Sequence, residues 1–298
     1  MTRPAPPIAG IELGGTKCIC TLANGPQDIR EQHSVATQDP ATTLAGIRAV
    51  LERWWHGPGF RALGIASFGP LGLDRARPDF GHVLATTKPG WAGADVAGTL
   101  SRGFAVPLSF DTDVNGAAMA ELRWGAGRGL ADFAYVTVGT GVGVGLIVNG
   151  APVRGFGHCE MGHLRVPRLP GDTLPSSCAF HEDCVEGLAS GSALKLVLGG
   201  RSPAGLTPQD PLWDRITDAV AKLCHAMAST TAPLRIAIGG GVFAAQPHLL
   251  PRIEPALRAS LNGYLALPEG PYVVAPELGT LAGPLGPIAL ALGADVPV

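Results

Sequence analysis

A strand, a glycine-rich turn and a second strand occur twice in this chain, and this repeat constrains the fold more than any other feature. The first copy spans residues 8–24 around Gly14-Gly15-Thr16, and the second spans residues 133–149 around Gly139-Thr140-Gly141. The copies begin about 125 residues apart, which is too far for a solenoid repeat. The spacing therefore predicts a duplicated domain, with two half-molecules whose hairpin turns point into a shared cleft.

Strands and helices alternate through the rest of the chain, as in α/β proteins. A helix over residues 41–55 is predicted by Leu44, Ile47 and Leu51, which recur at helical spacing. Other apolar patterns predict strands at 62–66, 108–110 and 234–238, and helices at 116–124, 185–198, 212–230 and 281–292. We expect the last helix to pack on the first half of the chain.

Composition excludes several classes of protein. A chain of 298 residues can form two domains of about 150 residues, each with its own core. The net charge of −2 and the pI near 6.4 disfavour nucleic acid as a partner. The most apolar segment, residues 134–148, is interrupted by four glycines, so we expect no membrane span. The N-terminus lacks the apolar core of a signal peptide, and we expect a cytoplasmic protein with reduced cysteines.

Four side chains have the spacing of a metal site, namely His163, Cys178, His181 and Cys184. Three of them are separated by two-residue gaps and the fourth lies about fifteen residues upstream, a pattern typical of tetrahedral Zn²⁺ sites. The alternative is a set of ordinary buried cysteines and a loop histidine. Because protein groups fill all four positions, such a zinc ion would be structural.

Three glycine-rich turns follow predicted strands: Gly14-Gly15-Thr16-Lys17, Gly139-Thr140-Gly141 and Gly239-Gly240-Gly241. Glycine allows the backbone amides of a turn to approach a phosphate closely. Most single glycine turns are only turns, but three at the ends of strands favour a nucleotide site. The sequence contains neither the P-loop pattern nor the dinucleotide-binding motif of a leading βαβ unit.

Asp113 follows a predicted strand and precedes a predicted helix, with Asp111 and Asn115 close by. A carboxylate in this place could accept the proton of a hydroxyl group that attacks a phosphate. Either aspartate could instead cap the helix. Because the glycine turns favour a nucleotide site, we predict that Asp113 is the base and that Asp111 is the cap.

Glu160 and Glu186 flank the predicted metal ligands in the sequence. Their carboxylates, together with the imidazole of His163, offer directional acceptors for sugar hydroxyls. His163 could bind the metal through one ring nitrogen and face the substrate with the other. The metal would then hold the loops that bind the sugar.

Taken together, these motifs resemble the ROK family of sugar kinases over essentially the whole chain. Gly14-Gly15-Thr16-Lys17 and residues 138–143 resemble the family's two phosphate loops, and residues 238–241 resemble its adenosine-side turn. Residues 111–115 are similar to its catalytic segment, with the base at Asp113, and residues 160–163 to its sugar-and-zinc signature. Residues 67–70, 87–91 and 178–184 are similar to the fructokinase branch.

This resemblance implies the duplicated actin-like ATPase fold, which is ribonuclease H-like, with two domains flanking a cleft. It implies a small domain at residues 1–114 plus 283–298, and a larger domain at 115–282 that carries the zinc-bound substrate loop. A homodimer that uses MgATP and a sugar is also expected, with Asn115, Glu160, His163 and Glu186 on the sugar. The expected reaction is phosphorylation of D-fructose at its 6-hydroxyl.

Two alternatives remain. A glucokinase, mannokinase or broad hexokinase could use the same scaffold, and Val144 and Glu182 stand where glycine is common in the family. A non-catalytic, sugar-sensing regulator is the remote alternative. Regulators of this family resemble the kinases with an added N-terminal DNA-binding domain, for which a first strand beginning by Ile8 leaves no room.

Overall fold

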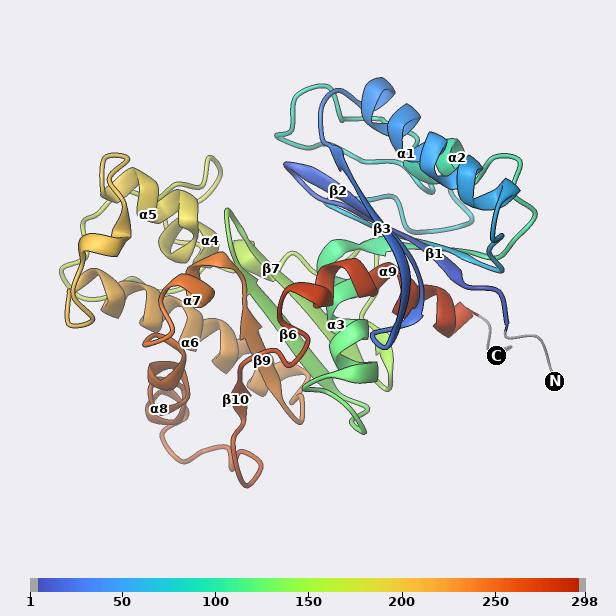
Figure 1. Cartoon of the computed structure of the whole chain (residues 1–298). Coiled ribbons are helices and arrows are strands. Elements are labelled where there is room, and N and C mark those ends of the chain that lie inside the picture. Colours follow the sequence, from blue (N-terminus) through green and yellow to red (C-terminus); the bar gives the residue numbers. More distant parts are fainter. Residues whose placement is uncertain (1–4, 295–298) are drawn as a thin grey trace. The chain divides into compact units, whose positions relative to one another are not determined.

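The computed structural model describes residues 5–294, which fold into two compact units (Figure 1). The first unit contains the residues up to Gly125, the segment Pro152–His158 and the residues from Leu278 onward. The second unit contains Ala126–Ala151 and Cys159–Glu277. The first unit therefore extends beyond the boundaries at 114 and 283 that the sequence suggested. The outermost parts of that expected domain, residues 1–4 and 295–298, lie outside the described residues.

The first unit is built on a five-stranded sheet with the order β3-β2-β1-β4-β5. Its strands are β1 (Ile8–Leu13), β2 (Lys17–Gly25), β3 (Asp28–Ala36), β4 (Leu63–Ser67) and β5 (Leu108–Thr112). β1 pairs with β2 as an antiparallel hairpin, whereas β1, β4 and β5 run parallel to one another. The carboxyl ends of these three parallel strands consequently meet at one edge of the sheet.

Helices cover both faces of this first sheet (Figure 1). One face carries α1 (Pro40–His56) and α2 (Val96–Ser101), and the other carries α3 (Asp113–Trp124) and α9 (Ala282–Ala294). The structure confirms the predicted helix over residues 41–55, whose start is capped by the Asp39 side chain and which buries the expected apolar face.

Close packing between α3, α9 and the first sheet explains the boundary of the first unit. A Cβ atom added at Gly64 in β4 would overlap the carbonyl group of Pro287, and Gly116 of α3 touches Gly286. Such close backbone contacts require glycine and leave no space for solvent. The helix α3 thus belongs with the sheet that precedes it, and α9 returns to the first half of the chain as expected.

The second unit repeats the topology of the first. Its sheet has the order β10-β9-β6-β7-β8, with β6 and β7 antiparallel and with β9 parallel to both β6 and β10. The strands β6, β7, β8, β9 and β10 correspond to β1, β2, β3, β4 and β5. With this correspondence, the second order read backwards is the order of the first sheet. The duplication expected from the two hairpin patterns is therefore present in the topology. The strands are β6 (Phe133–Val138), β7 (Val142–Val148), β8 (Ala151–Pro152), β9 (Ile236–Gly239) and β10 (Val273–Val274).

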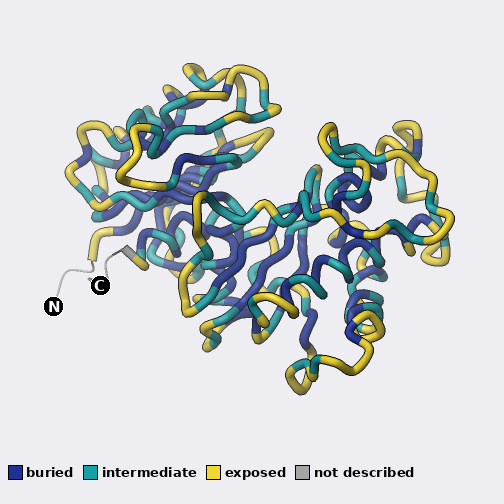
Figure 2. Tube along the Cα trace, turned by 180° about the vertical axis from the view of Figure 1, so that it is seen from behind, coloured by how far each residue is buried: buried dark blue, intermediate teal, exposed yellow. Residues whose placement is uncertain are grey.

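Short helices surround the loops of the second unit. The predicted helix over residues 185–198 is divided into two, because the Ser190 hydroxyl accepts a hydrogen bond from the Ala193 amide and begins a new helix. The strands are largely buried, whereas the turns and the loop before α4 are exposed or half-buried for the most part (Figure 2). The helices are α4 (Val185–Ala189), α5 (Gly191–Val197), α6 (Leu212–Thr230), α7 (Gly241–Ala245) and α8 (Leu250–Leu261), with short 3-10 turns at Met161–His163, Pro203–Gly205 and, in the first unit, Gly279–Leu281.

No helix within residues 5–294 has both the length and the apolar character needed to cross a membrane.

Candidate active site

The first glycine turn lies at the edge of the first sheet where parallel strands end. Its backbone is held by Thr37, whose hydroxyl donates to the Gly14 carbonyl at 2.7 Å and whose amide donates to the Thr16 carbonyl at 3.0 Å. A Cβ at Gly14 would lie 2.6 Å from the Lys17 carbonyl oxygen, so this turn requires glycine. Gly15 and Thr16 are exposed, which leaves their backbone accessible to a ligand.

Asp113 is the first residue of α3, directly after β5. Its helix is capped by the Thr112 hydroxyl, which accepts a hydrogen bond from the Asn115 amide at 3.1 Å. The prediction that Asp111 is the cap is therefore wrong. Because Thr112 does this work, the half-buried Asp113 carboxylate is not needed as the cap; it accepts a hydrogen bond from the Val114 amide at 2.8 Å.

Asp111 holds neighbouring side chains instead of capping the helix. It is almost fully buried, and it accepts hydrogen bonds from the Asn115 side-chain amide at 2.8 Å and from the Thr112 backbone amide at 2.7 Å. Its second oxygen accepts from the Arg154 guanidinium at 2.5 Å. A buried carboxylate requires such partners. Asp111 thus fixes the orientation of Asn115, one of the predicted sugar-binding residues.

Glu12, near the end of β1, adds a second acidic group close to Asp113. The pKa of Glu12 is raised from 4.5 to about 7, mainly by burial and then by the negative charge of Asp113, while the positive charge of Lys17 opposes both effects. Like charges that lie close together disfavour ionisation of both groups. Such a strongly shifted carboxyl group is typical of functional sites.

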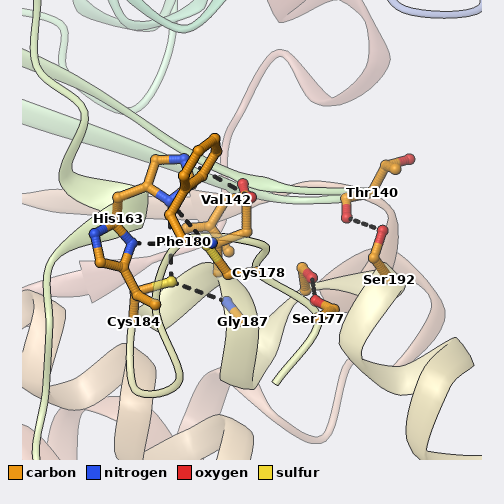
Figure 3. Close-up of polar contacts among 12 residues, drawn as sticks. Thr140, Val142, His163, Ser177, Cys178, Phe180, Cys184, Gly187 and Ser192 are labelled. Atoms are coloured by element: carbon orange, nitrogen blue, oxygen red, sulfur yellow. Dashed lines mark hydrogen bonds and ion pairs between the residues drawn. The ribbon is translucent and has the colours of Figure 1, made fainter. Parts of the chain in front are cut away.

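The second and third glycine turns meet at the edge of the second sheet. The Gly139 carbonyl accepts from the Gly191 amide at 2.7 Å, and the Ser192 hydroxyl donates to the Thr140 carbonyl at 2.8 Å (Figure 3). Gly240 has a positive φ of 91°, and a Cβ added there would lie only 2.5 Å from the backbone of Val138. Both turns therefore sit at the ends of the paired strands β6 and β9, as the nucleotide hypothesis requires.

The four predicted metal ligands gather in the second unit. One ligand atom from each of His163, Cys178, His181 and Cys184 lies within 4.8 Å of the others. The Cys178 sulfur lies 3.6 Å from Nδ1 of His163 and 3.7 Å from Nδ1 of His181. Two backbone amides point at the sulfurs: Phe180 donates to Cys178 and Gly187 donates to Cys184 (Figure 3).

Glu186 connects this cluster to the second glycine turn. One of its carboxylate oxygens accepts a hydrogen bond from the Val142 amide at 3.0 Å, and the other lies 3.9 Å from Nε2 of His163. Since Nδ1 of His163 faces the cysteines, its two ring nitrogens face different groups, and Nε2 lies near Glu186. Outer carboxylates of this kind orient metal-bound histidines.

Glu160 stands at the start of the short helix that carries His163. Its side chain is exposed, and its backbone carbonyl accepts a hydrogen bond from the His163 amide at 3.0 Å. Glu160, His163 and Glu186 thus belong to the second unit, whereas Asp113 and Asn115 belong to the first. The structure therefore brings Asp113 close to Asn115, and His163 close to Glu160 and Glu186.

Sequence reasoning missed three charged residues of the first unit. Glu12 stands two residues before Gly14, and a charged residue within the apolar pattern of residues 8–13 was the available signal. Lys88 precedes Pro89-Gly90, a pair typical of turns. Arg154 had no recognisable signal, because its contact with Asp111 depends on the fold alone.

Two sheets of equal strand order, each with a glycine turn at the end of its first strand, define a duplicated α/β protein. The model of the ROK family matches residues 8–294, and the chain belongs to this family. A fructokinase from Pediococcus pentosaceus is 36% identical over 288 residues, which cover 96% of this chain and 98% of the relative.

Solved structures show the same architecture. A ROK hexokinase from Thermus thermophilus matches with a TM-score of 0.77 and 26% identity, covering 97% of this chain and 99% of that one. A ROK glucokinase from Streptomyces griseus, solved with glucose and AMPPNP, matches with a TM-score of 0.74 and 26% identity, covering 96% and 99%. The actin-like ATPase fold expected from the motifs is thereby confirmed.

The raised pKa of Glu12 predicts how stability depends on pH. Between pH 4.5 and about 7 the folded chain binds more protons at Glu12 than the unfolded chain, so stability falls as the pH rises through this window. The free energy of unfolding that is lost in this way amounts to at most about 3 kcal/mol. We expect Glu12→Gln to remove the loss, because glutamine does not titrate. Urea unfolding at about pH 5 and about pH 8 would measure the difference.

The matched control is Glu52→Gln, since Glu52 is an exposed residue of α1 in the same unit. We expect the control to keep the pH dependence of the wild-type protein. If Glu12→Gln and the wild type lose the same stability across this range, Glu12 does not titrate as stated.

Proposed function

We propose that this chain is a fructokinase, which transfers the γ-phosphate of ATP to the 6-hydroxyl of D-fructose. The observation that carries this proposal is the 36% identity to a fructokinase over nearly the whole of both chains. The ROK hexokinase and glucokinase structures are less similar, at 26% identity. Fructose is therefore the favoured acceptor, and glucose or mannose is the alternative.

In this proposal Asp113 is the general base. Its position at the start of α3, with the cap supplied by Thr112, leaves a half-buried carboxylate that can accept the proton of the attacking hydroxyl. Asn115, held by Asp111, and Glu160, His163 and Glu186 would position the sugar. Phosphoryl transfer depends mostly on positioning and on neutralising charge, which such groups supply.

The nucleotide would be bound through the three glycine turns. Gly14, Gly15, Thr16 and Lys17 in the first unit and Gly139, Thr140 and Gly141 in the second would contact its phosphates. Gly239, Gly240 and Gly241 would lie on the adenosine side. Mg²⁺ would enter with ATP as part of the substrate and would neutralise phosphate charge.

We further propose that His163, Cys178, His181 and Cys184 bind a structural Zn²⁺ ion. The donor set fits this metal, because two sulfurs and two imidazoles are the ligands that tetrahedral zinc prefers. Zn–S bonds of about 2.3 Å and Zn–N bonds of about 2.0 Å place ligand atoms less than 4 Å apart. Three of the four sulfur–nitrogen distances, at 3.6, 3.7 and 3.9 Å, agree with this requirement. Bound zinc would hold the loop from His163 to Cys184.

The test of the proposed function is a coupled assay with ATP and four separate acceptors: fructose, mannose, glucose and N-acetylmannosamine. We expect the highest kcat/KM for fructose. A higher kcat/KM for glucose or mannose would favour the alternative kinases, and phosphorylation of none of the four would contradict the proposal.

Replacement of the base should abolish most turnover. Asp113→Asn keeps the size of the side chain but removes the proton acceptor, and we expect kcat to fall by at least about 10²-fold. Far-UV circular dichroism and the unfolding midpoint should stay close to those of the wild type. Wild-type turnover in this variant would remove Asp113 from the proposed role.

Removal of the metal should first affect sugar binding. Because the cluster holds the loop that carries His163 and lies beside Glu186, chelation should raise the KM for fructose more than the KM for ATP. Added Zn²⁺ should restore the original value. If complete removal of zinc, verified by elemental analysis, leaves the KM for fructose unchanged, this coupling is wrong.

A further inference from the structure

Lys88 lies beside the first glycine turn, although it is far from that turn in the sequence. Its ammonium group donates a hydrogen bond to the Gly15 carbonyl and lies 4.9 Å from the centre of the Phe68 ring. A Cβ atom added at Gly15 would lie 3.3 Å from the same nitrogen. The ammonium group therefore stands directly against the backbone of the turn.

The backbone of Lys88 is held in place by a tight turn. The Lys88 carbonyl accepts a hydrogen bond from the Trp91 amide at 3.2 Å, and Gly90 between them has a positive φ of 77°. Proline followed by a glycine with positive φ is the signature of a type II turn. Because Pro89 also restricts the residue before it to extended conformations, Lys88 has little conformational freedom in its backbone.

The end of this turn is fastened to the core of the first unit. Trp91 is almost fully buried, and its indole nitrogen donates to the Gln38 carbonyl at 2.9 Å. Its ring meets that of Phe68 edge to face, with 5.1 Å between the centroids. Phe68 in turn donates its amide to the Leu13 carbonyl at the end of β1. The position of Lys88 is therefore set by the same strand end that positions the glycine turn.

Within the part of the chain that the structure describes, no ion pair balances the charge of Lys88. Among residues 5–294, no carboxylate forms a salt bridge with it, and its ammonium has two N–H groups besides the one that Gly15 needs. Burial raises the pKa of Cys18 at the start of β2, where Glu12 raises it further and Lys88 lowers it. The charges of Lys88 and Glu12 thus both act on Cys18, so the two side chains lie in the same small region.

We propose that Lys88 is a catalytic residue of the kinase reaction, whose ammonium group contacts the phosphoryl group in transit and neutralises its negative charge. This inference rests on the proposed kinase function. The lysine keeps its proton throughout and donates hydrogen bonds to phosphoryl oxygens, while Asp113 accepts the proton of the sugar hydroxyl. Fixed cations at the site of phosphoryl transfer stabilise the transition state without moving during the reaction.

A purely structural role is the competing explanation, since Lys88 could simply tie the loop over residues 86–91 to the glycine turn. The two roles differ in what they predict for nucleotides. A residue that contacts the γ-phosphate affects binding of a triphosphate but not of a diphosphate. A tether that shapes the turn affects both to a similar extent.

The experiment compares Lys88→Met and Lys88→Arg with the wild type by calorimetric titration with MgADP and with Mg-β,γ-methylene-ATP. In Lys88→Met we expect the affinity for the triphosphate analogue to fall about tenfold, with MgADP changed less than about twofold. We expect kcat to fall by about 10²-fold and to be partly restored in Lys88→Arg. Lys195→Met, at an exposed lysine of α5, is the control and should match the wild type.

Equal weakening of both nucleotides in Lys88→Met, or an unchanged kcat, would overturn the assignment of Lys88. If the wild type phosphorylates none of the tested sugars, the proposed function fails, and the two nucleotide affinities still decide whether Lys88 contacts the third phosphate. A wild-type protein that binds neither nucleotide would overturn both proposals.

Discussion

Parallel pairing of the strands is the constraint on which the rest of this structure depends. In the first sheet Leu13 is level with Ser67, and Ser67 is level with Thr112, so three strands end together. This register brings the turn after β1, the loop that contains Phe68 and the start of α3 to one edge. In the second sheet Thr137 is level with Gly239, which unites two glycine turns in the same way. Ligand sites of α/β proteins form at such carboxyl ends because loops from distant parts of the sequence meet there.

The edge of the first sheet combines groups of both charge signs at short range. Glu12 and Asp113 would repel each other if both were ionised, and burial together with this repulsion raises the pKa of Glu12 to about 7. Partial protonation of Glu12 near neutral pH lowers its repulsion with Asp113. Lys17 offsets the remaining negative charge from the start of β2. A negatively charged phosphate approaching this edge therefore meets less repulsion than two ionised carboxylates would produce.

The sequence was sufficient where a feature depends on residues close together in the chain. The hairpin pattern predicted both glycine turns, and the two-residue gaps between Cys178, His181 and Cys184 predicted a cluster that the structure contains. The sequence was insufficient where contacts between distant residues decide the role of a side chain. Asp111 could not be distinguished from Thr112 as the cap of α3, because the difference lies in the buried contacts of Asp111 with Arg154 and Asn115. The strand Asp28–Ala36 has no apolar face in its sequence, so only its pairing with β2 reveals it.

In the second unit, a single carboxylate group links what the sequence presents as separate motifs. Glu186 accepts the Val142 amide at the glycine turn and also faces His163, whose other nitrogen points at the cysteines. A Cβ added at Gly141 would lie against the same carboxylate, so the turn and Glu186 cannot move independently. Cys184 begins the helix that carries Glu186, since its sulfur accepts the Gly187 amide at 3.3 Å. Any change in the position of Cys184 must therefore shift the carboxylate that supports the turn, and packed groups of this kind transmit small displacements instead of absorbing them.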